Sequence, residues 1–453
     1  MKKFFAYIKS LSTHHLALDQ ALFYSLLART AQMVAGAITL VFIIYFFHPV
    51  EQGFYYTFNS VLNMELFFEL GLTFVILQTT SHYFINLTWQ ENGEISGNIT
   101  EQERLLAFLK KSAYWYIIAA LAFGMILIPA GGYFFSLKKE LPIHFHWWLP
   151  WILVVAGSAL NLSLSPFLAS IEGSGQVAKV YRFRTQQLFL ASGASWIVLA
   201  AGGGLYMLVA NVWVNALYEL VWLLKKYKSY LLSIWNTSKE KIFSWQKEIW
   251  PLQWRIALSW MAGFFISQIF TPLLFYYAGP VNAGQMGVSI TILTMLSLIS
   301  ITWLNVRSPQ MGRLAAQRHW AELNSVFKRA FYQSIFIFIF SAVVLGLFAY
   351  EIRHTTLSDR FLPWQQNMLL LASMLITHII SAIATYLRAH RQDPFMPFSL
   401  IGAALVSLGS WYGAAHYGSV GVCWAVFLIN LIYGLPSTLW LRIHCKRRWH
   451  IES

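Results

Sequence analysis

Long apolar stretches alternate with short polar stretches along almost the whole chain of 453 residues. Each apolar stretch is long enough to cross about 30 Å of hydrocarbon as a helix. A tight turn from Ala201 to Gly204 separates the fifth stretch from the sixth, and a re-entrant pair is the alternative there. The pattern predicts twelve membrane-spanning helices, near residues 21–47, 54–79, 113–136, 147–171, 185–202, 205–223, 252–278, 283–306, 331–350, 364–387, 395–414 and 419–441.

The composition agrees with a chain that lies mostly in lipid. Hydrophobic residues make up 57% of the sequence and charged residues 11%, and the mean hydropathy is +0.54. These values exclude a soluble domain. Together with the length of the apolar stretches, they predict an all-α polytopic membrane protein.

Lys and Arg are distributed unevenly between alternate connecting segments. Most of the 32 basic residues lie on the side of the amino terminus, whereas the opposite segments contain only Lys138, Lys139, Arg353 and Arg360. Positive residues accumulate on the cytoplasmic side of membrane proteins. We therefore expect both termini to be cytoplasmic. The net charge of +14 follows from this topology and requires no nucleic-acid partner.

The two halves of the chain share a short sequence pattern. HPVEQG follows the first span and GPVNAG follows the seventh, so that Pro49 and Gly53 recur as Pro280 and Gly284. Each half has six spans, an even number, which predicts parallel repeats about an axis along the membrane normal. We expect an N-terminal six-helix lobe at residues 1–223, a basic cytoplasmic connector at 224–250, and a C-terminal six-helix lobe with a basic tail at 251–453.

The segment from His48 to Gln78 carries a family resemblance. It resembles the start of Wzx-like polysaccharide-exporter proteins of the multidrug/oligosaccharidyl-lipid/polysaccharide (MOP) superfamily. In that family a Gly-aromatic turn opens the second helix and an acidic-Leu-Gly-Leu element closes it. The chain has Glu69 where Asp is usual. The matching residues are Glu51, Gly53, Tyr55, Glu69, Leu70, Gly71 and Leu72.

This resemblance implies a flippase that moves undecaprenyl-diphosphate-linked oligosaccharide across the bacterial inner membrane by alternating access. The product would be a surface polysaccharide such as lipopolysaccharide O-antigen. The implied partners are the lipid-linked oligosaccharide and the bilayer, with polysaccharide-assembly proteins as further candidates and no cofactor. An ion-coupled, MATE-like exporter of small molecules is the alternative, and a membrane polysaccharide polymerase or ligase comes third.

The enzyme alternative lacks support in the sequence. The predicted outward loops are short, and the chain has no phosphate-cradling Gly-rich loop, no HExxH motif and no paired-aspartate metal site. We therefore expect a transporter rather than an enzyme, and no metal site.

Two arginines lie within predicted spans, Arg29 and Arg255. A charge at the bilayer centre costs roughly 2.5–3.5 kcal/mol, so it usually faces the interior of the helix bundle. The guanidinium fork matches phosphate oxygens, which makes both residues candidates for binding the diphosphate. Arg29 could instead pair with Glu65 or Glu69 and join two helices. Arg255 could snorkel to the headgroups.

Glu65 and Glu69 lie four residues apart and share one face of the second predicted helix. Two like charges repel unless one is protonated or a cation bridges them, which favours proton or sodium coupling, with a protonated structural pair as the alternative. His378, near the middle of the tenth span, is a further coupling candidate or else a packing histidine. Asn59 and Asn63 are candidates for binding sugar hydroxyls or for interhelical hydrogen bonds.

Overall fold

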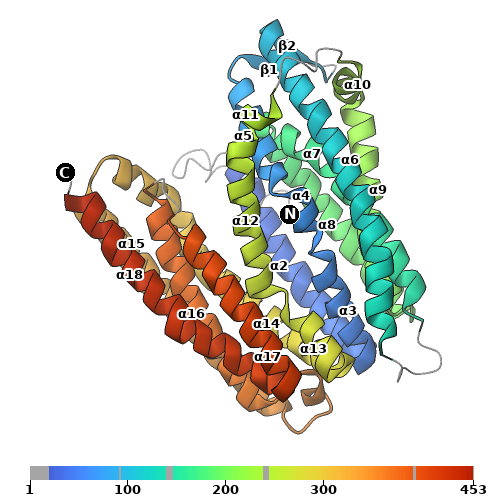
Figure 1. The fold of residues 1–453 in the computed structure, drawn as a ribbon, viewed down its shortest axis with the longest axis vertical. Coiled ribbons are helices and arrows are strands. Elements are labelled where there is room, and N and C mark those ends of the chain that lie inside the picture. The colour runs from blue at the N-terminus through green and yellow to red at the C-terminus, as the bar shows by residue number, and fades with distance from the viewer. Residues whose placement is uncertain (1–19, 91–92, 139–145, 238–243, 391–393, 452–453) are drawn as a thin grey trace, which may run out of the picture. The chain divides into compact units, whose positions relative to one another are not determined.

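The computed structural model describes residues 20–90, 93–138, 146–237, 244–390 and 394–451, and it is almost entirely helical (Figure 1). Internal contacts divide the chain into two compact units. The first comprises Met1–Phe46, Glu65–Phe135 and Pro142–Ala257, and the second comprises Phe47–Met64, Ser136–Leu141 and Leu258–Ser453. The lobe boundaries predicted from the sequence stay a prediction.

The first unit is a helical bundle with a small sheet at one end. Helix α8 packs against α2 and α9, and α7 packs against α5 and α9. The elements are α2 (Gln20–Phe46), α4 (Glu65–Glu69), α5 (Leu72–Tyr83), β1 (Leu87–Trp89), β2 (Ile95–Gly97), α6 (Ile99–Ser136), α7 (Trp148–Gly173), α8 (Val177–Ala200), α9 (Tyr206–Lys226), α10 (Lys228–Asn236), α11 (Trp245–Glu248) and the first part of α12 (Trp250–Ser267).

The sheet is an element that the hydrophobic pattern did not predict. Strands β1 and β2 pair antiparallel, with Thr88 opposite Ser96. Trp89 fixes the hairpin to the helices, because its indole Nε1 donates to Ser174 Oγ at 2.8 Å and its ring lies 5.0 Å from that of Tyr230 in α10. The predicted basic connector thus contributes an ordered helix to the first unit, although residues 238–243 of that connector lie outside the described residues.

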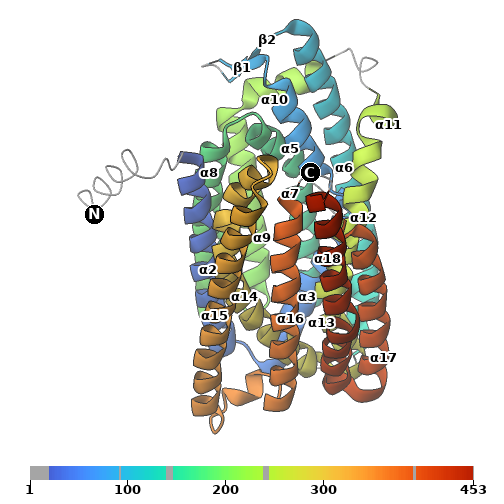
Figure 2. The ribbon, with the colours of Figure 1, turned by 90° about the vertical axis from the view of Figure 1, so that its left-hand side faces the viewer.

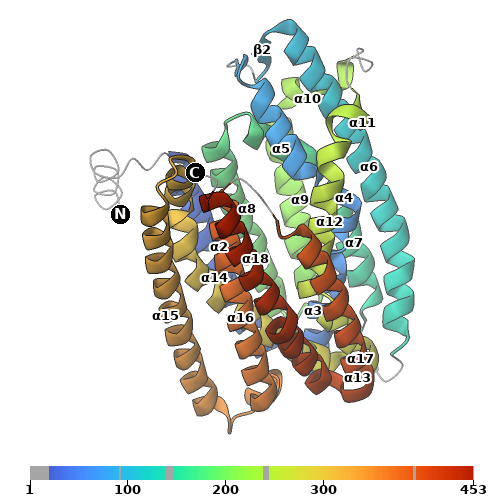
Figure 3. The same ribbon diagram turned by 60° about the vertical axis from the view of Figure 1, so that its left-hand side comes forward.

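The second unit is built around one long helix. Helix α14 packs against α3, α13, α15 and α16, and α16 packs against α17 and α18 (Figures 2 and 3). The elements are α3 (Pro49–Leu62), the last part of α12, α13 (Phe270–Ala278), α14 (Pro280–Ala316), α15 (Trp320–Ile352), the 3₁₀ turn η2 (Ser358–Arg360), α16 (Trp364–Arg388), α17 (Met396–Ile429), the π turn η3 (Asn430–Gly434) and α18 (Leu435–Ile451).

Helices α3 and α14 approach each other at the two segments that share the sequence pattern. Both helices begin with proline, Pro49 and Pro280, as is common at the first helical position. A Cβ atom on Gly53 would lie 1.9 Å from the carbonyl oxygen of Pro280, and one on Gly284 would lie 2.8 Å from the backbone nitrogen of Gly53. Only glycine therefore allows these two helix starts to touch.

The element labelled α17 contains two helical arms that fold back on each other. Gly418 has φ of 58° and ψ of −138°, which is not helical. On either side of it, Gly413 and Gly421 are packed backbone to backbone, so that a Cβ on Gly413 would lie 2.5 Å from the carbonyl carbon of Gly421. Gly409 packs against the side chain of Ile429, whose Cδ1 would lie 2.7 Å from a Cβ on Gly409. The arms are therefore antiparallel, as Figure 3 shows for α17 and α18.

Eight helices in the described part of the chain are long and apolar enough to cross a membrane, or up to ten when two bent pairs each count as one span. In a bilayer such helices satisfy their own backbone hydrogen bonds. The predicted nearly all-helical, multi-pass membrane protein is thus confirmed. The count of twelve spans, the repeat and the side on which the termini lie stay predictions, and residues 1–19 and 452–453 are outside the described residues.

Candidate functional site

The second predicted span is broken at Leu70 and Gly71. Helix Pro49–Glu69 ends there and helix Leu72–Tyr83 begins, with a bend of 47° between them. Leu70 has φ of 51° and Gly71 has φ of 67°, both in the left-handed region. A non-glycine residue in that region is strained by about 1–3 kcal/mol, and such strain clusters at functional sites. The acidic-Leu-Gly-Leu element of the sequence is therefore a helix break.

Glu69 lies at this break and accepts two hydrogen bonds. Its Oε1 accepts from the backbone N–H of Thr73 at 3.3 Å, at the start of α5, and from the hydroxyl of Tyr116 at 3.3 Å. The hydroxyls of Thr73 and Tyr116 are 2.6 Å apart. Tyr116 is fully buried in α6. A carboxylate at the positive end of α5 is electrostatically favourable, so Glu69 is held in place by the broken helix.

Glu65 lies one turn before Glu69 in the five-residue helix α4, and both side chains are half-buried. Glu69 has two hydrogen-bond donors, whereas the described part of the chain offers Glu65 no hydrogen bond or ion pair. Two carboxylate charges on one helix face repel each other, which is the physical basis of the predicted coupling site. That role stays a prediction.

Arg255 belongs to the helix that packs on the break. A Cβ atom on Gly71 would lie 2.5 Å from Cγ2 of Ile256, so α12 lies directly against the left-handed turn. The Arg255 side chain is exposed, and its guanidinium carbon lies 5.5 Å from the ring of Trp254. The first unit thus brings an exposed arginine and two carboxyl groups to segments that touch.

Arg29 lies on α2 and is also exposed. Among the described residues, the structure contains no ion pair between Arg29 and Glu65 or Glu69, so the structural pairing considered from the sequence is not formed. An exposed guanidinium on a membrane helix is available to an anion.

A second break occurs in the seventh predicted span. Helices Gln253–Ser267 and Phe270–Ala278 are bent by 42° at Gln268 and Ile269. Asn63 donates to the side-chain oxygen of Gln268 at 3.1 Å, and the hydroxyl of Ser60 donates to its backbone carbonyl. Asn59 donates to Tyr55 O within its own helix, at 2.9 Å. Asn63 is therefore part of a polar group at a helix break, and the role of Asn59 stays a prediction.

His378 is fully buried in the second unit. Its Nε2 lies 2.5 Å from the hydroxyl of Ser334, its Nδ1 lies 3.4 Å from that of Ser297, and its ring contacts Phe338. Both ring nitrogens have hydroxyl partners from neighbouring helices. This environment suits a packing histidine that joins α14, α15 and α16.

Two further polar pairs lie outside the candidate site residues of the sequence. Glu219 of α9 is buried, and its Oε2 accepts from Gln187 at 3.3 Å while its Oε1 has no hydrogen-bond partner. Gln52 of α3 is buried and donates to the carbonyl of Arg360 at 3.1 Å. Burial lowers the pKa of Arg360, and the Glu51 carboxylate opposes that shift. Spacing along the chain gave no signal for either pair, because their partners come from distant helices.

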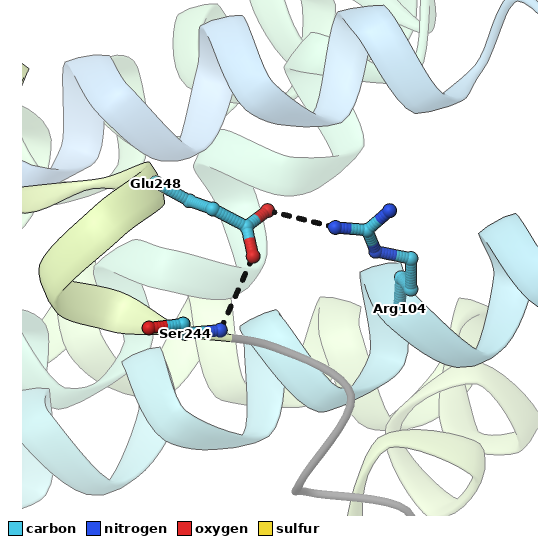
Figure 4. Close-up of polar contacts among 3 residues, drawn as sticks. All are labelled: Arg104, Ser244 and Glu248. Carbon is cyan, nitrogen blue, oxygen red and sulfur yellow. Dashed lines mark hydrogen bonds and ion pairs between the residues drawn. The ribbon is translucent and has the colours of Figure 1, made fainter.

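An ion pair joins α6 to the predicted connector. Arg104 Nη2 lies 3.1 Å from Glu248 Oε2, and the other carboxylate oxygen of Glu248 accepts from the backbone N–H of Ser244 at 3.2 Å (Figure 4). Both side chains are partly exposed. Glu248 thus caps α11 and fixes it to the first turns of α6.

The described residues contain no group of three or more His, Cys, Asp or Glu that could hold a metal ion. The polar groups gathered at the helix breaks are suited to bind a charged or hydroxyl-rich solute. No nucleophile with an adjacent base is among them.

Comparison with known proteins gives structural matches only. No protein-family model matches the sequence, and no curated protein matches it. The lipid II flippase MurJ in an inward closed conformation matches with a TM-score of 0.59 and 13% identity, covering 92% of this chain and 87% of that one. An inward-facing multidrug resistance MATE family transporter of the MOP superfamily matches with a TM-score of 0.55 and 12% identity, covering 91% and 94%.

A MOP superfamily transporter from Pyrococcus furiosus matches with a TM-score of 0.50 and 13% identity, covering 94% of this chain and 95% of that one. All three matches extend over nearly the full length of both chains. At such identities they concern the fold. The chain has the fold of MOP superfamily transporters.

Proposed function

We propose that the chain is a flippase for undecaprenyl-diphosphate-linked oligosaccharide in the bacterial inner membrane. The observation that carries the proposal is the break at Leu70 and Gly71, with Glu65, Glu69 and the Arg255 segment beside it, on the fold of MOP superfamily transporters. Interrupted membrane helices occur where backbone lines a cavity, and in transporters they form the substrate site. One structural match is a lipid II flippase, so this fold accommodates a lipid-linked cargo.

In this proposal Arg29 and Arg255 bind the diphosphate. Both are exposed on helices of the first unit, and neither has an ion-pair partner among the described residues. The guanidinium fork binds phosphate oxygens in pairs. Asn63, with Gln268, and Asn59 are the candidates for the sugar hydroxyls.

Coupling to an ion is assigned to Glu65 and Glu69, with His378 as the remaining candidate. The membrane potential also favours outward movement of a negative cargo, by about 2.3 kcal/mol per charge per 100 mV. A coupled ion is therefore compatible with flipping but is not required for it.

The topology in this proposal has twelve spans in two six-helix lobes, with cytoplasmic termini. The twelve spans are the eight apolar helices, the two bent pairs, helix α8 and the second arm of the hairpin at Gly418. The close approach of Gly53 and Gly284, which occupy matching positions in the two halves, supports a repeat with its axis near that contact.

The alternative function is an ion-coupled exporter of small cationic molecules. The acidic pair Glu65 and Glu69 favours it, because two carboxyl groups at a helix break would attract a cation. Several structural matches are multidrug resistance transporters, which share this fold. A polymerase or ligase is the third candidate.

The test is a deletion of the gene in its host, complemented with wild type and variants. We expect the deletion to abolish surface polysaccharide and to leave undecaprenyl-linked repeat units on the cytoplasmic face. Wild type should restore export, and Arg29→Ala should not. Arg313→Ala, which removes an exposed arginine in the last turn of α14, is the matched control and should restore export.

Two outcomes would contradict the proposal. Normal polysaccharide with altered drug sensitivity, abolished by Glu69→Gln and unaffected by Arg29→Ala, would assign the chain to the exporters. Repeat units on the outer leaflet would indicate a polymerase or ligase.

A further inference from the structure

The second unit contains a cavity of about 570 Å³ that no candidate function uses. It lies between α14, α15 and α16, beneath the segment that contains η2. Figures 2 and 3 show this segment joining the ends of α15 and α16. The volume falls within the range of about 300–1,000 Å³ that is typical of ligand pockets.

The lining contributed by α15 includes three small residues among larger ones. Ala342, Gly346 and Ala349 line the cavity from one face of this helix. The nearest atom to a Cβ placed on Gly346 would be in the ring of Trp364, at 3.9 Å. The deeper surface is aliphatic and includes Ile292 and Leu371. The cavity is therefore a largely apolar shaft, and at Gly346 its wall has room that a larger side chain would fill.

Polar side chains of the lining hold the segment that contains η2 in place. Gln285 donates to the carbonyl of Asp359 at 2.9 Å, and the hydroxyl of Ser289 accepts from the backbone N–H of Leu362 at 3.3 Å. Asn367 donates to the carbonyl of Leu362 at 2.5 Å. These hydrogen bonds fix the segment that contains η2 to α14 and α16. The cavity is therefore preformed.

The mouth of the shaft carries one cation and one anion. Arg353 is exposed, stacks on Tyr350 at 3.4 Å and donates its Nε to His354, which leaves the terminal nitrogens of its guanidinium for a ligand. Asp359 also lines the cavity, and the described residues contain no ion pair between it and Arg353. Tyr350 and Trp364 are largely exposed here, as aromatic residues are at the level of lipid headgroups.

We propose that this cavity binds a zwitterionic phospholipid, with one acyl chain in the shaft, the phosphate on Arg353 and the ammonium on Asp359. The length of the shaft fits this ligand. From Ala342 to Arg353 the helix rises by about 16 Å at 1.5 Å per residue, which matches one leaflet of a hydrocarbon core of about 30 Å. With the proposed topology the lipid belongs to the outer leaflet.

The experiment measures lipid retention with no cargo present, so its result is independent of the proposed function. The purified full-length protein is exchanged into nanodiscs that contain phosphatidylethanolamine, phosphatidylglycerol or both, and retained lipids are counted by native mass spectrometry. We expect wild type to retain one phosphatidylethanolamine in preference to phosphatidylglycerol. Arg353→Ala should weaken retention of both lipids about tenfold, the loss expected for one charge-assisted hydrogen bond.

Two further variants separate the headgroup contact from the shaft. Asp359→Asn should weaken only phosphatidylethanolamine, because it removes the partner of the ammonium. Gly346→Leu should reduce retention of both lipids by filling the shaft, and Ala349→Leu provides the same test if the first variant folds poorly. Gly312→Leu is the matched control, since a Cβ there meets no atom within 4 Å.

Unchanged retention in Gly346→Leu and Ala349→Leu would overturn the proposal. Preferential retention of an isoprenoid diphosphate added as a competitor would also overturn it, because the shaft would then bind the carrier lipid of the cargo.

Discussion

At the scale of single residues, Gly71 combines two constraints that can be separated by experiment. Its left-handed φ of 67° disfavours a side chain, and its position against Ile256 leaves no room for one. Gly175 has a similar φ of 88°, and a Cβ there would meet nothing within 4 Å. The two glycines lie in the same unit, so they form a matched pair.

We predict that Gly71→Ala lowers the thermal stability of the purified protein more than Gly175→Ala does. Both variants incur the cost of a left-handed alanine, about 1–2 kcal/mol. Only Gly71→Ala also forces α12 away from the break. Equal shifts in melting temperature would show that the contact between α12 and the break contributes nothing to stability. Gly71→Ala should also reduce transport.

His390 predicts a pH dependence of stability. It follows α16, and its ring stacks on those of Trp320 and Trp449. Burial lowers its pKa from the usual value of 6.5, and hydrogen bonds with the backbone oppose that shift. The unfolded chain therefore binds a proton more readily than the folded one, and stability is lost as the pH falls below about 6.5.

We expect His390→Phe, which keeps the ring stack, to flatten the decline in melting temperature between pH 7 and pH 5. A wild-type slope in His390→Phe would exclude this histidine as the source.

The sequence marked some of the polar residues at the helix breaks as candidates and left others out. Glu65 and Glu69 were visible because charges are rare in apolar runs, and the break beside them explains why they lie together. His378 was a candidate on the same ground, and the structure surrounds it with serine hydroxyls instead of other ionisable groups. Gln268 and Glu219 have ordinary roles in a membrane protein, interhelical hydrogen bonding and neutralisation of nearby lysines, and so the sequence did not mark them as site residues.

At the scale of elements, the hairpin at Gly418 depends on close packing of two glycines. A Cβ on Gly413 would lie 2.5 Å from the backbone of Gly421, whereas one on Gly402 would meet only the ring of Tyr433 at 3.5 Å. We predict that Gly413→Ala destabilises the protein by about 1–3 kcal/mol, as overpacking does. Gly402→Ala should be neutral or slightly stabilising. Comparable melting temperatures for the two variants would contradict the backbone contact.

The apolar pattern predicted the existence and type of most helices but not their ends or breaks. Helix α6 begins at Ile99, well before the predicted span, because an amphipathic stretch continues the same helix outside the apolar run. The breaks at Leu70 and Gln268 lie inside continuous apolar runs, and hydropathy is insensitive to backbone conformation. The sheet was missed since its strands are only three residues long.

At the scale of the whole molecule, the proposed topology predicts which connections face outward. In a background without Cys423 and Cys445, we expect Tyr417→Cys to react in intact cells with a membrane-impermeant maleimide. His319→Cys should react only after permeabilisation. Both positions are exposed, so access to the side chain is not limiting. Labelling of both from one side would contradict the twelve-span topology.

The hairpin at Gly418 has a consequence for biosynthesis. Its two arms are joined without a hydrophilic segment, since Gly413 and Gly421 already touch on either side of the turn. The ribosome therefore releases a pair of helices with no polar loop to be translocated, and the first arm reaches its final packing only when the second has been made. A nascent chain that stops near residue 417 would expose the glycine face of this arm to lipid.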